Sequence, residues 1–152
     1  MSVQRLDSLL EKLVKLGEVP TDGLRMSVGR EIMRVADAAR LGAPGYTGEL
    51  RNSIRTMTET LNGRSIRGTC FTAKQYAPYV EFGTGPAGEQ NHGGISPAVS
   101  PAYTQKPWWI HESQIDRADA ERYGWAYIDT EKGRFYRCSG QAAQPFMYPA
   151  LK

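Results

Sequence analysis

The sequence contains few residues of the kinds that build catalytic, metal or disulfide sites. Only two cysteines, Cys70 and Cys138, and two histidines, His92 and His111, occur among its 152 residues. A disulfide framework or a zinc site needs more ligands at closer spacing, so we expect both cysteines to be buried free thiols in a reducing cytoplasm. Neither histidine belongs to an HExxH pair. The sequence therefore predicts no cofactor and no bound metal.

Long apolar runs and strong charge are missing as well. No hydrophobic stretch approaches the length of a membrane-spanning helix, and Asp7, Glu11 and Lys12 interrupt the apolar positions near the N-terminus, which argues against a signal peptide. The net charge of +3 is lower than that of a dedicated nucleic-acid binder with a dense basic patch. The length fits one domain, over residues 1–152, with no membrane partner.

Helical spacing dominates the first third of the chain. Apolar residues recur at helical intervals over residues 2–16, and again from Thr21 or Asp22 to the glycine and proline residues at 42–45. We therefore predict two helices within residues 2–42. In the first helix, an apolar face is more commonly part of the core than a surface for a partner, although an N-terminal helix can dock on a neighbouring subunit. In the second helix, arginines on the polar side are more commonly solvated than bound to nucleic acid.

Strand patterns dominate the rest, over residues 47–152. Threonine-rich residues 55–61, an Asn62-Gly63 turn and residues 65–73 predict a β-hairpin with one apolar face covered by a helix. A Gly/Pro-rich loop is expected from Gly85 to Pro107. The expected elements beyond it are a strand containing Trp108 and Trp109, with one tryptophan in the core and the other at a surface or interface, a helix over 116–123, and a second hairpin from 125–130 and 134–138.

The residues 76–85, Tyr-Ala-Pro-Tyr-Val-Glu-Phe-Gly-Thr-Gly, form a compact aromatic stretch that we interpret as a rigid, partly buried hinge leading into this loop. Residues 83–88 match GxGxxG, but no strand precedes them and we expect no helix to begin there, so dinucleotide binding is not predicted. Glu81 lies between Val80 and Phe82. A carboxylate in that position should pair with an arginine or with backbone N–H groups.

Three motifs in this order resemble a known family. They are Gly48-x-Leu50-x-x-Ser53-Ile54, the aromatic stretch 76–85, and Gln141-x-x-x-Pro145-Phe146-Met147-x-Pro149-Ala150-Leu151. The chain resembles the small tail-component, or head–tail joining (tail-completion), proteins of tailed bacteriophages and prophages.

The resemblance implies an α+β fold in which N-terminal helices pack on an antiparallel β-sheet of hairpins. It also implies a non-enzymatic virion protein of the phage neck, made in the host cytoplasm and assembled as a ring around the DNA channel, in the adaptor, stopper, completion or terminator position. The expected partners are further copies of the chain, other neck, connector and tail proteins, and DNA that passes without sequence specificity.

The same resemblance suggests which residues form a structural corner or interface, and the loop 85–107 is expected to reach a neighbouring subunit. The candidates are Tyr76, Tyr79, Glu81, Phe82, Gly83, Thr84, Gly85, Gln144, Pro145, Phe146 and Pro149, with Trp108 and Trp109 as possible interface residues.

Two alternative functions would use other residues of the chain. A DNA-binding accessory protein of phage assembly would use Arg25, Arg30, Arg34, Arg51, Arg55, Arg64 and Arg67. A small hydrolase would be built around His111 with Asp116 or Glu112, although no nucleophile stands beside a base in the sequence.

Overall fold

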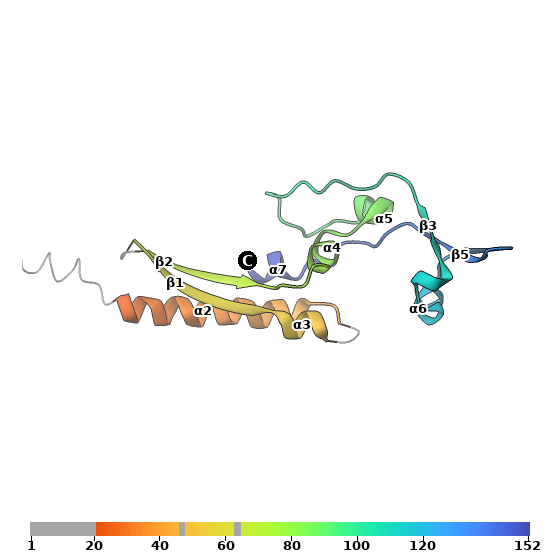
Figure 1. The fold of residues 1–152 in the computed structure, drawn as a ribbon. Helices are drawn as coiled ribbons and strands as arrows, with labels where there is room; N and C mark the ends of the chain where they lie inside the picture. The colour runs from red at the N-terminus through yellow and green to blue at the C-terminus, as the bar shows by residue number, and fades with distance from the viewer. Residues whose placement is uncertain (1–20, 46–47, 63–64) are drawn as a thin grey trace, which may run out of the picture.

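The computed structural model describes residues 21–45, 48–62 and 65–152, and the chain forms an elongated molecule (Figure 1). The helix predicted over 2–16 and Gly63 of the predicted turn lie outside these residues. The elements in chain order are α2 (Thr21–Gly42), α3 (Glu49–Ser53), β1 (Arg55–Leu61), β2 (Ser65–Phe71), α4 (Ala77–Phe82), α5 (Gly85–Gln90), β3 (Trp108–His111), the 3-10 helix η1 (Glu112–Gln114), α6 (Arg117–Arg122), β4 (Tyr127–Thr130), β5 (Gly133–Cys138) and α7 (Met147–Ala150).

Helix α2 lies along one face of the β1–β2 hairpin, as expected (Figure 1). The two strands pair antiparallel from Arg55 opposite Phe71 to Leu61 opposite Ser65. Gly68 allows the helix to approach closely, because a Cβ at this position would lie 3.0 Å from Cβ of Ile32 and 3.1 Å from Cγ1 of Val28. The predicted α+β class, with a long N-terminal helix packed on an antiparallel hairpin, is confirmed.

The main core lies where the second half of α2 meets α3 and the two ends of the segment 77–146. Among the residues that the structure describes, seven buried ones from four separate parts of the chain form this core: Ala36, Ala39, Ala43, Leu50, Ile54, Ala77 and Phe146. Four of the seven are alanines, so backbones approach closely here and the large side chains Ile54 and Phe146 fill the space between them.

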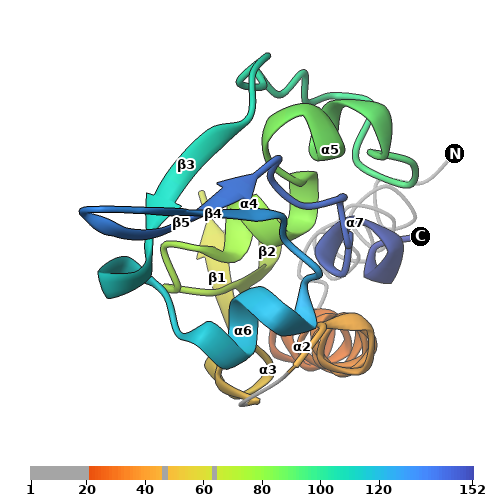
Figure 2. The same ribbon diagram turned by 90° about the vertical axis from the view of Figure 1, so that its right-hand side faces the viewer.

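A second, three-stranded sheet stands at the other end of the molecule, in the order β3–β5–β4 (Figures 1 and 2). We call residues 108–138, which contain this sheet and α6, the distal unit. The predicted second hairpin is present, with Tyr127 opposite Tyr136 and Ile128 opposite Phe135. The predicted helix over 116–123 is also present as α6, which Asp116 caps by accepting a hydrogen bond from Ala118 N at 2.8 Å.

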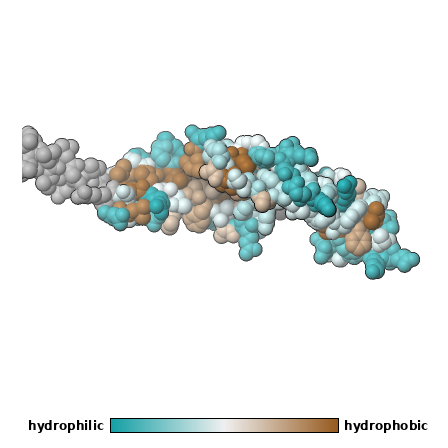
Figure 3. All heavy atoms as spheres, turned by 90° about the horizontal axis from the view of Figure 1, so that it is seen from above, coloured by the Kyte–Doolittle hydropathy of each residue, from teal (hydrophilic) through white to brown (hydrophobic). Residues whose placement is uncertain are grey.

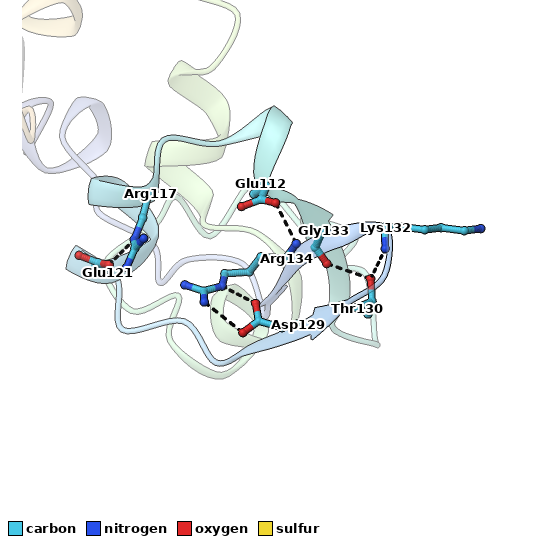
Figure 4. A network of polar contacts seen from close by, with 8 residues as sticks. All are labelled: Glu112, Arg117, Glu121, Asp129, Thr130, Lys132, Gly133 and Arg134. Carbon is cyan, nitrogen blue, oxygen red and sulfur yellow. Dashed lines mark hydrogen bonds and ion pairs between the residues drawn. The ribbon is translucent and has the colours of Figure 1, made fainter.

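Charged side chains pair with one another on the surface of the distal unit (Figure 4). Arg134 donates to both carboxylate oxygens of Asp129, at 2.7 and 3.1 Å, and its backbone N–H donates to Glu112 at 3.0 Å. The hydrogen bond from Arg134 lowers the pKa of the Asp129 carboxyl below its ordinary value. On α6, Arg117 pairs with Glu121 at 2.8 Å.

Several expectations about this region were wrong. The loop predicted from Gly85 begins as helix α5, so the segment without helix or strand runs over 91–107. Both adjacent tryptophans are exposed, Trp108 by 36% and Trp109 by 48%, and neither is in the core. The reason is that β3 is an edge strand of a small sheet, with little protein available to cover either face.

The two cysteines differ in exposure. Cys138 is buried, as expected, whereas Cys70 is only half-buried, and both are free thiols. Burial raises the pKa of both thiols, which keeps them protonated and slows their reactions. Within the described residues, no helix is long and apolar enough to cross a membrane.

The close contact at Gly68 gives a stability prediction. We expect Gly68→Val to lower the free energy of unfolding by about 1–3 kcal/mol, because the new side chain overlaps Ile32 and Val28. Gly29 lies in α2, the helix of Ile32 and Val28, and a Cβ added there would lie 3.8 Å from Thr58 Oγ1, an ordinary contact. Gly29→Ala should therefore raise the free energy of unfolding by about 0.5–1 kcal/mol. Urea unfolding measures both. A Gly68→Val chain as stable as the wild type would show that α2 does not pack on β2 at this point.

Candidate functional site

The candidate site residues gather where helix α4 meets the C-terminal segment. We call this region, residues 76–85 together with 139–149, the α4–α7 corner. In α4, Ala77 and Glu81 are four residues apart and therefore share one face, and both are buried, with 4% and 6% of their surface exposed. Glu81 is the only charged residue that is buried among those the structure describes.

The Glu81 carboxylate accepts hydrogen bonds from three consecutive backbone N–H groups. Its Oε2 atom accepts from Phe146 at 2.7 Å and Met147 at 2.9 Å, and its Oε1 atom accepts from Tyr148 at 3.0 Å. These N–H groups lie at the start of α7, where a helix leaves its first donors without partners. The carboxylate therefore caps a helix 65 residues away in the sequence. Of the two kinds of partner expected for Glu81, an arginine or backbone N–H groups, the structure shows the backbone N–H groups.

A second seam of backbone hydrogen bonds runs beside this cap. Thr84 and Gln141 exchange two bonds, from Thr84 N to Gln141 O at 2.9 Å and from Gln141 N to Thr84 O at 3.1 Å. The N–H of Gln144 donates to Val80 O at 2.8 Å. The side chain of Gln141 adds a hydrogen bond to Tyr79 O at 2.9 Å. Two segments that are distant in sequence are thus joined along their backbones.

Gly83 makes this close approach possible. Its φ angle of 77° lies in the left-handed region, which favours glycine. A Cβ here would also lie 2.7 Å from Ala143 N and 2.8 Å from Gln141 O, both of them backbone atoms that cannot move aside. The geometry therefore requires glycine at position 83, the first glycine of the pattern Phe-Gly-Thr-Gly.

Phe146 joins the corner to the main core. Its side chain is 2% exposed and packs among the alanines of α2, and a Cβ added to Gly42 would lie only 3.6 Å from the Phe146 Cα atom. Because the neighbouring N–H groups are held by Glu81, the position of Phe146 depends on that carboxylate. The arrangement fixes the C-terminal segment against α2.

The structure brings most of the predicted corner residues together and leaves some outside. Thr84, Gln144, Phe82 and Phe146 take part through backbone or core contacts, whereas Tyr76, Tyr79 and Pro149 expose their side chains. Gly85 and Pro145 are buried and half-buried respectively. Trp108 lies against Gly85, and Trp109 lies further along β3 in the distal unit.

We expected residues 76–85 to form a hinge, and we expected no helix to begin at residue 85. Both expectations were wrong. Both segments are helical, α4 with Pro78 and α5 with Pro86 in the first turn. Proline is tolerated there because the first N–H groups of a helix have no internal partner. The element before the GxGxxG match is helix α4, not the strand that a dinucleotide-binding loop follows.

Some corner residues escaped the sequence reasoning. Gln141 opens the same Gln-x-x-x-Pro-Phe-Met motif that carried the resemblance, and that signal could have placed it in the site. Tyr103, whose hydroxyl donates to Phe82 O at 2.8 Å, and Asn91, whose carbonyl accepts from Ala143 N at 2.8 Å, lie in or beside the Gly/Pro-rich loop. No periodicity marks either residue.

The residues of the two alternative functions have local structural partners. His111 contacts Ser113 Oγ at 2.7 Å and Lys132 O at 2.9 Å, while Glu112 binds a backbone N–H of β5. Among the arginines, Arg34 pairs with Glu31 at 3.0 Å and Arg67 with Glu59 at 3.6 Å. The remaining candidates are Arg25 and Arg30 on α2, Arg51 on α3, Arg55 on β1, and Arg64 outside the described residues. In the described parts of the chain no cluster of His, Cys, Asp and Glu could hold a metal ion.

These observations define a protein of the α+β class in which one buried carboxylate and a seam of backbone hydrogen bonds fix the C-terminal segment. A family model described as "Bacteriophage HK97-gp10, putative tail-component" matches residues 7–83, half of the chain, and the chain belongs to this family of phage tail components. No curated protein and no solved structure matches the chain. The matched stretch includes Glu81 but ends before its partners in α7.

The cap on α7 gives a direct test of the corner. Glu81→Gln replaces one accepting oxygen with an NH₂ group that faces an N–H donor, so we expect the free energy of unfolding to fall by about 2–3 kcal/mol. Glu89→Gln is a matched control, because Glu89 is exposed and accepts only from the Gln105 side chain among its described contacts. Urea unfolding should show less than about 0.5 kcal/mol for that control. Equal midpoints for the two variants would mean that Glu81 does not hold α7.

Proposed function

We propose that the chain is a non-enzymatic structural protein of the phage head–tail interface, which assembles as a ring of copies around the DNA channel. Membership of the tail-component family carries this proposal. Its partners would be further copies of itself and the neck, connector and tail proteins that lie above and below the ring. In the infected host the protein would be made in the cytoplasm and would end in the virion.

The distribution of apolar side chains supports an assembled state. In the described residues, fifteen large hydrophobic residues are exposed, against eleven hydrophobic residues that are buried. Single exposed hydrophobic residues are ordinary, but gathered ones mark surfaces that other proteins cover. Within the part of the chain that the structure describes, the β1–β2 sheet has two strands, and each strand has one edge without a strand partner. Neighbouring subunits would cover such surfaces.

The α4–α7 corner supports a static role. Glu81, Gly83 and the Thr84–Gln141 bridge hold the C-terminal segment against α2 without any side chain positioned for chemistry. A ring subunit needs a rigid body of this kind, because small errors in each contact would add up around the ring. The exposed side chains of Tyr76 and Tyr79 on α4 and its flank then serve as contact residues.

The DNA-binding alternative has less support. Two of its arginines are paired with carboxylates, and the formal net charge of the whole chain is only +3. A mild positive charge suits a channel in which DNA slides without being gripped.

Disruption of the gene in the parent phage tests the proposal. We expect electron microscopy of the lysate to show DNA-filled heads and finished tails lying separately, and a plasmid-borne wild-type copy to restore joined, infectious particles. Normal particles from the disrupted phage would refute the proposal. Heads accompanied by absent or abnormal tails would place the protein in tail construction and refute a role in joining.

A further inference from the structure

One flank of helix α2 is covered at its C-terminal end and open at its N-terminal end. At about 100° per residue, four residues of this flank lie within about 40° of one another around the helix. They are Leu24, Val28, Val35 and Gly42. At Gly42 the flank is covered by the segment of helix α7, since a Cβ added there would lie 3.6 Å from the Phe146 Cα atom (Figure 2).

The N-terminal part of this flank lacks the cover that the C-terminal part has. Leu24 is 43% exposed, and Val28 and Val35 are half-buried. Between residues 22 and 31 of α2, no residue is buried. Ile66, on the face of β2 that packs against α2, is also half-buried. Figure 3 shows hydrophobic residues at the surface of this end of the helix–hairpin body. We call Leu24, Val28, Val35 and Ile66 the open flank.

The open flank carries almost no charge. On α2 the charged residue nearest to it is Glu31, about 20° from Leu24 around the helix. Arg34, about 60° further round toward the solvent side, holds the Glu31 carboxylate at 3.0 Å. An apolar segment can therefore pack on the flank without burying an unpaired charge.

Residues 2–16 have the length and the apolar face that would cover the open flank. As a helix they span about 22 Å, which is also the length of α2 from Thr21 to Val35. The leucines that share one face of the predicted helix are Leu6, Leu9, Leu10, Leu13 and Leu16. The family match begins at residue 7 and so includes most of this segment.

The link between this segment and α2 is short. Residues 17–20 are Gly-Glu-Val-Pro, so residues 16 and 21 can be at most about 18 Å apart. Loops of this length commonly join antiparallel helices, and Gly17 suits the C-terminal end of the first one. The short link favours packing on the same chain over packing on a neighbouring copy.

We propose that residues 2–16 form a helix that folds back along α2 of the same chain and covers the open flank. Antiparallel pairing about residues 17–20 places Leu13 beside Leu24 and Leu9 beside Val28. The N-terminal helix and α7 then lie one after the other on the same side of α2. The occupant of the flank is this chain's own N-terminal segment, and the inference does not depend on the proposed head–tail role.

Aspartate substitutions in the purified full-length chain test the contact from both sides. Leu24→Asp alters the flank and Leu13→Asp alters the segment that would cover it. Met26→Asp and Ser8→Asp are the matched controls, because they add the same charge on the far sides of the two helices. Met26 is 68% exposed and lies about 160° from Leu24 around α2. Urea unfolding measures the equilibrium constant for folding of each variant, and circular dichroism verifies that each one folds.

We expect Leu24→Asp and Leu13→Asp each to lower the equilibrium constant for folding by roughly tenfold or more, because each places a charge in an apolar contact. Met26→Asp and Ser8→Asp should change it by less than about threefold. The chain with both Leu13→Asp and Leu24→Asp should lose less than the product of the two single losses, because either substitution alone already weakens the contact.

Methyl–methyl nuclear Overhauser contacts in the wild-type chain locate the segment directly. We expect contacts from the methyl groups of Leu9 and Leu13 to those of Leu24 and Val28. A mixture of isotope-labelled and unlabelled copies should show no such contact between copies.

Three outcomes would overturn the proposal. The first is a Leu13→Asp chain that is as stable as the Ser8→Asp chain. The second is a set of Overhauser contacts that joins residues 2–16 to a surface other than the open flank. The third is contacts between Leu13 and Leu24 that occur only between labelled and unlabelled copies, which would assign the flank to the N-terminal segment of a neighbouring copy.

Discussion

The Glu81 carboxylate and the three N–H groups of residues 146–148 set the position of the whole C-terminal segment. Helix α7 has only four residues, and no side chain of its own caps it. A helix this short is not stable alone, because nucleation costs more than so few hydrogen bonds return. The distant carboxylate supplies what the helix lacks, and Phe146 then fills the core beside α2.

Small residues set the other constraint on the fold. The core of α2 is mainly alanine, and Gly68 in β2 leaves room for Ile32 and Val28. Helix and hairpin therefore lie close together, and the core is thin. A thin core leaves many large hydrophobic side chains at the surface. Exposed hydrophobic surface of this kind is typical of proteins that contact other proteins in an assembly.

Periodic signals in the sequence predict the regular elements well. The apolar spacing of α2, the threonines of β1 and the pattern of β4 and β5 each have a repeat that reports local structure, and all of them form as expected. Helices α4 and α5 were not predicted, because a proline is read as a helix breaker unless it is known to lie in the first turn, as Pro78 and Pro86 do. The partners of Glu81 cannot be found from local pattern, since they lie 65 residues away. Before the fold is known, Glu81 is connected to these partners only by the resemblance to a family in which the stretch 76–85 and the motif 141–151 occur in this order.

The distal unit begins and ends at the same point, since Trp108 at its start pairs with Cys138 at its end. A segment whose two ends are adjacent can be lengthened, shortened or replaced without moving the residues that hold it. It also lies beyond the stretch shared with the family, which ends at Gly83. This end of the protein can therefore change in length or sequence without displacing α2, the β1–β2 hairpin or Glu81.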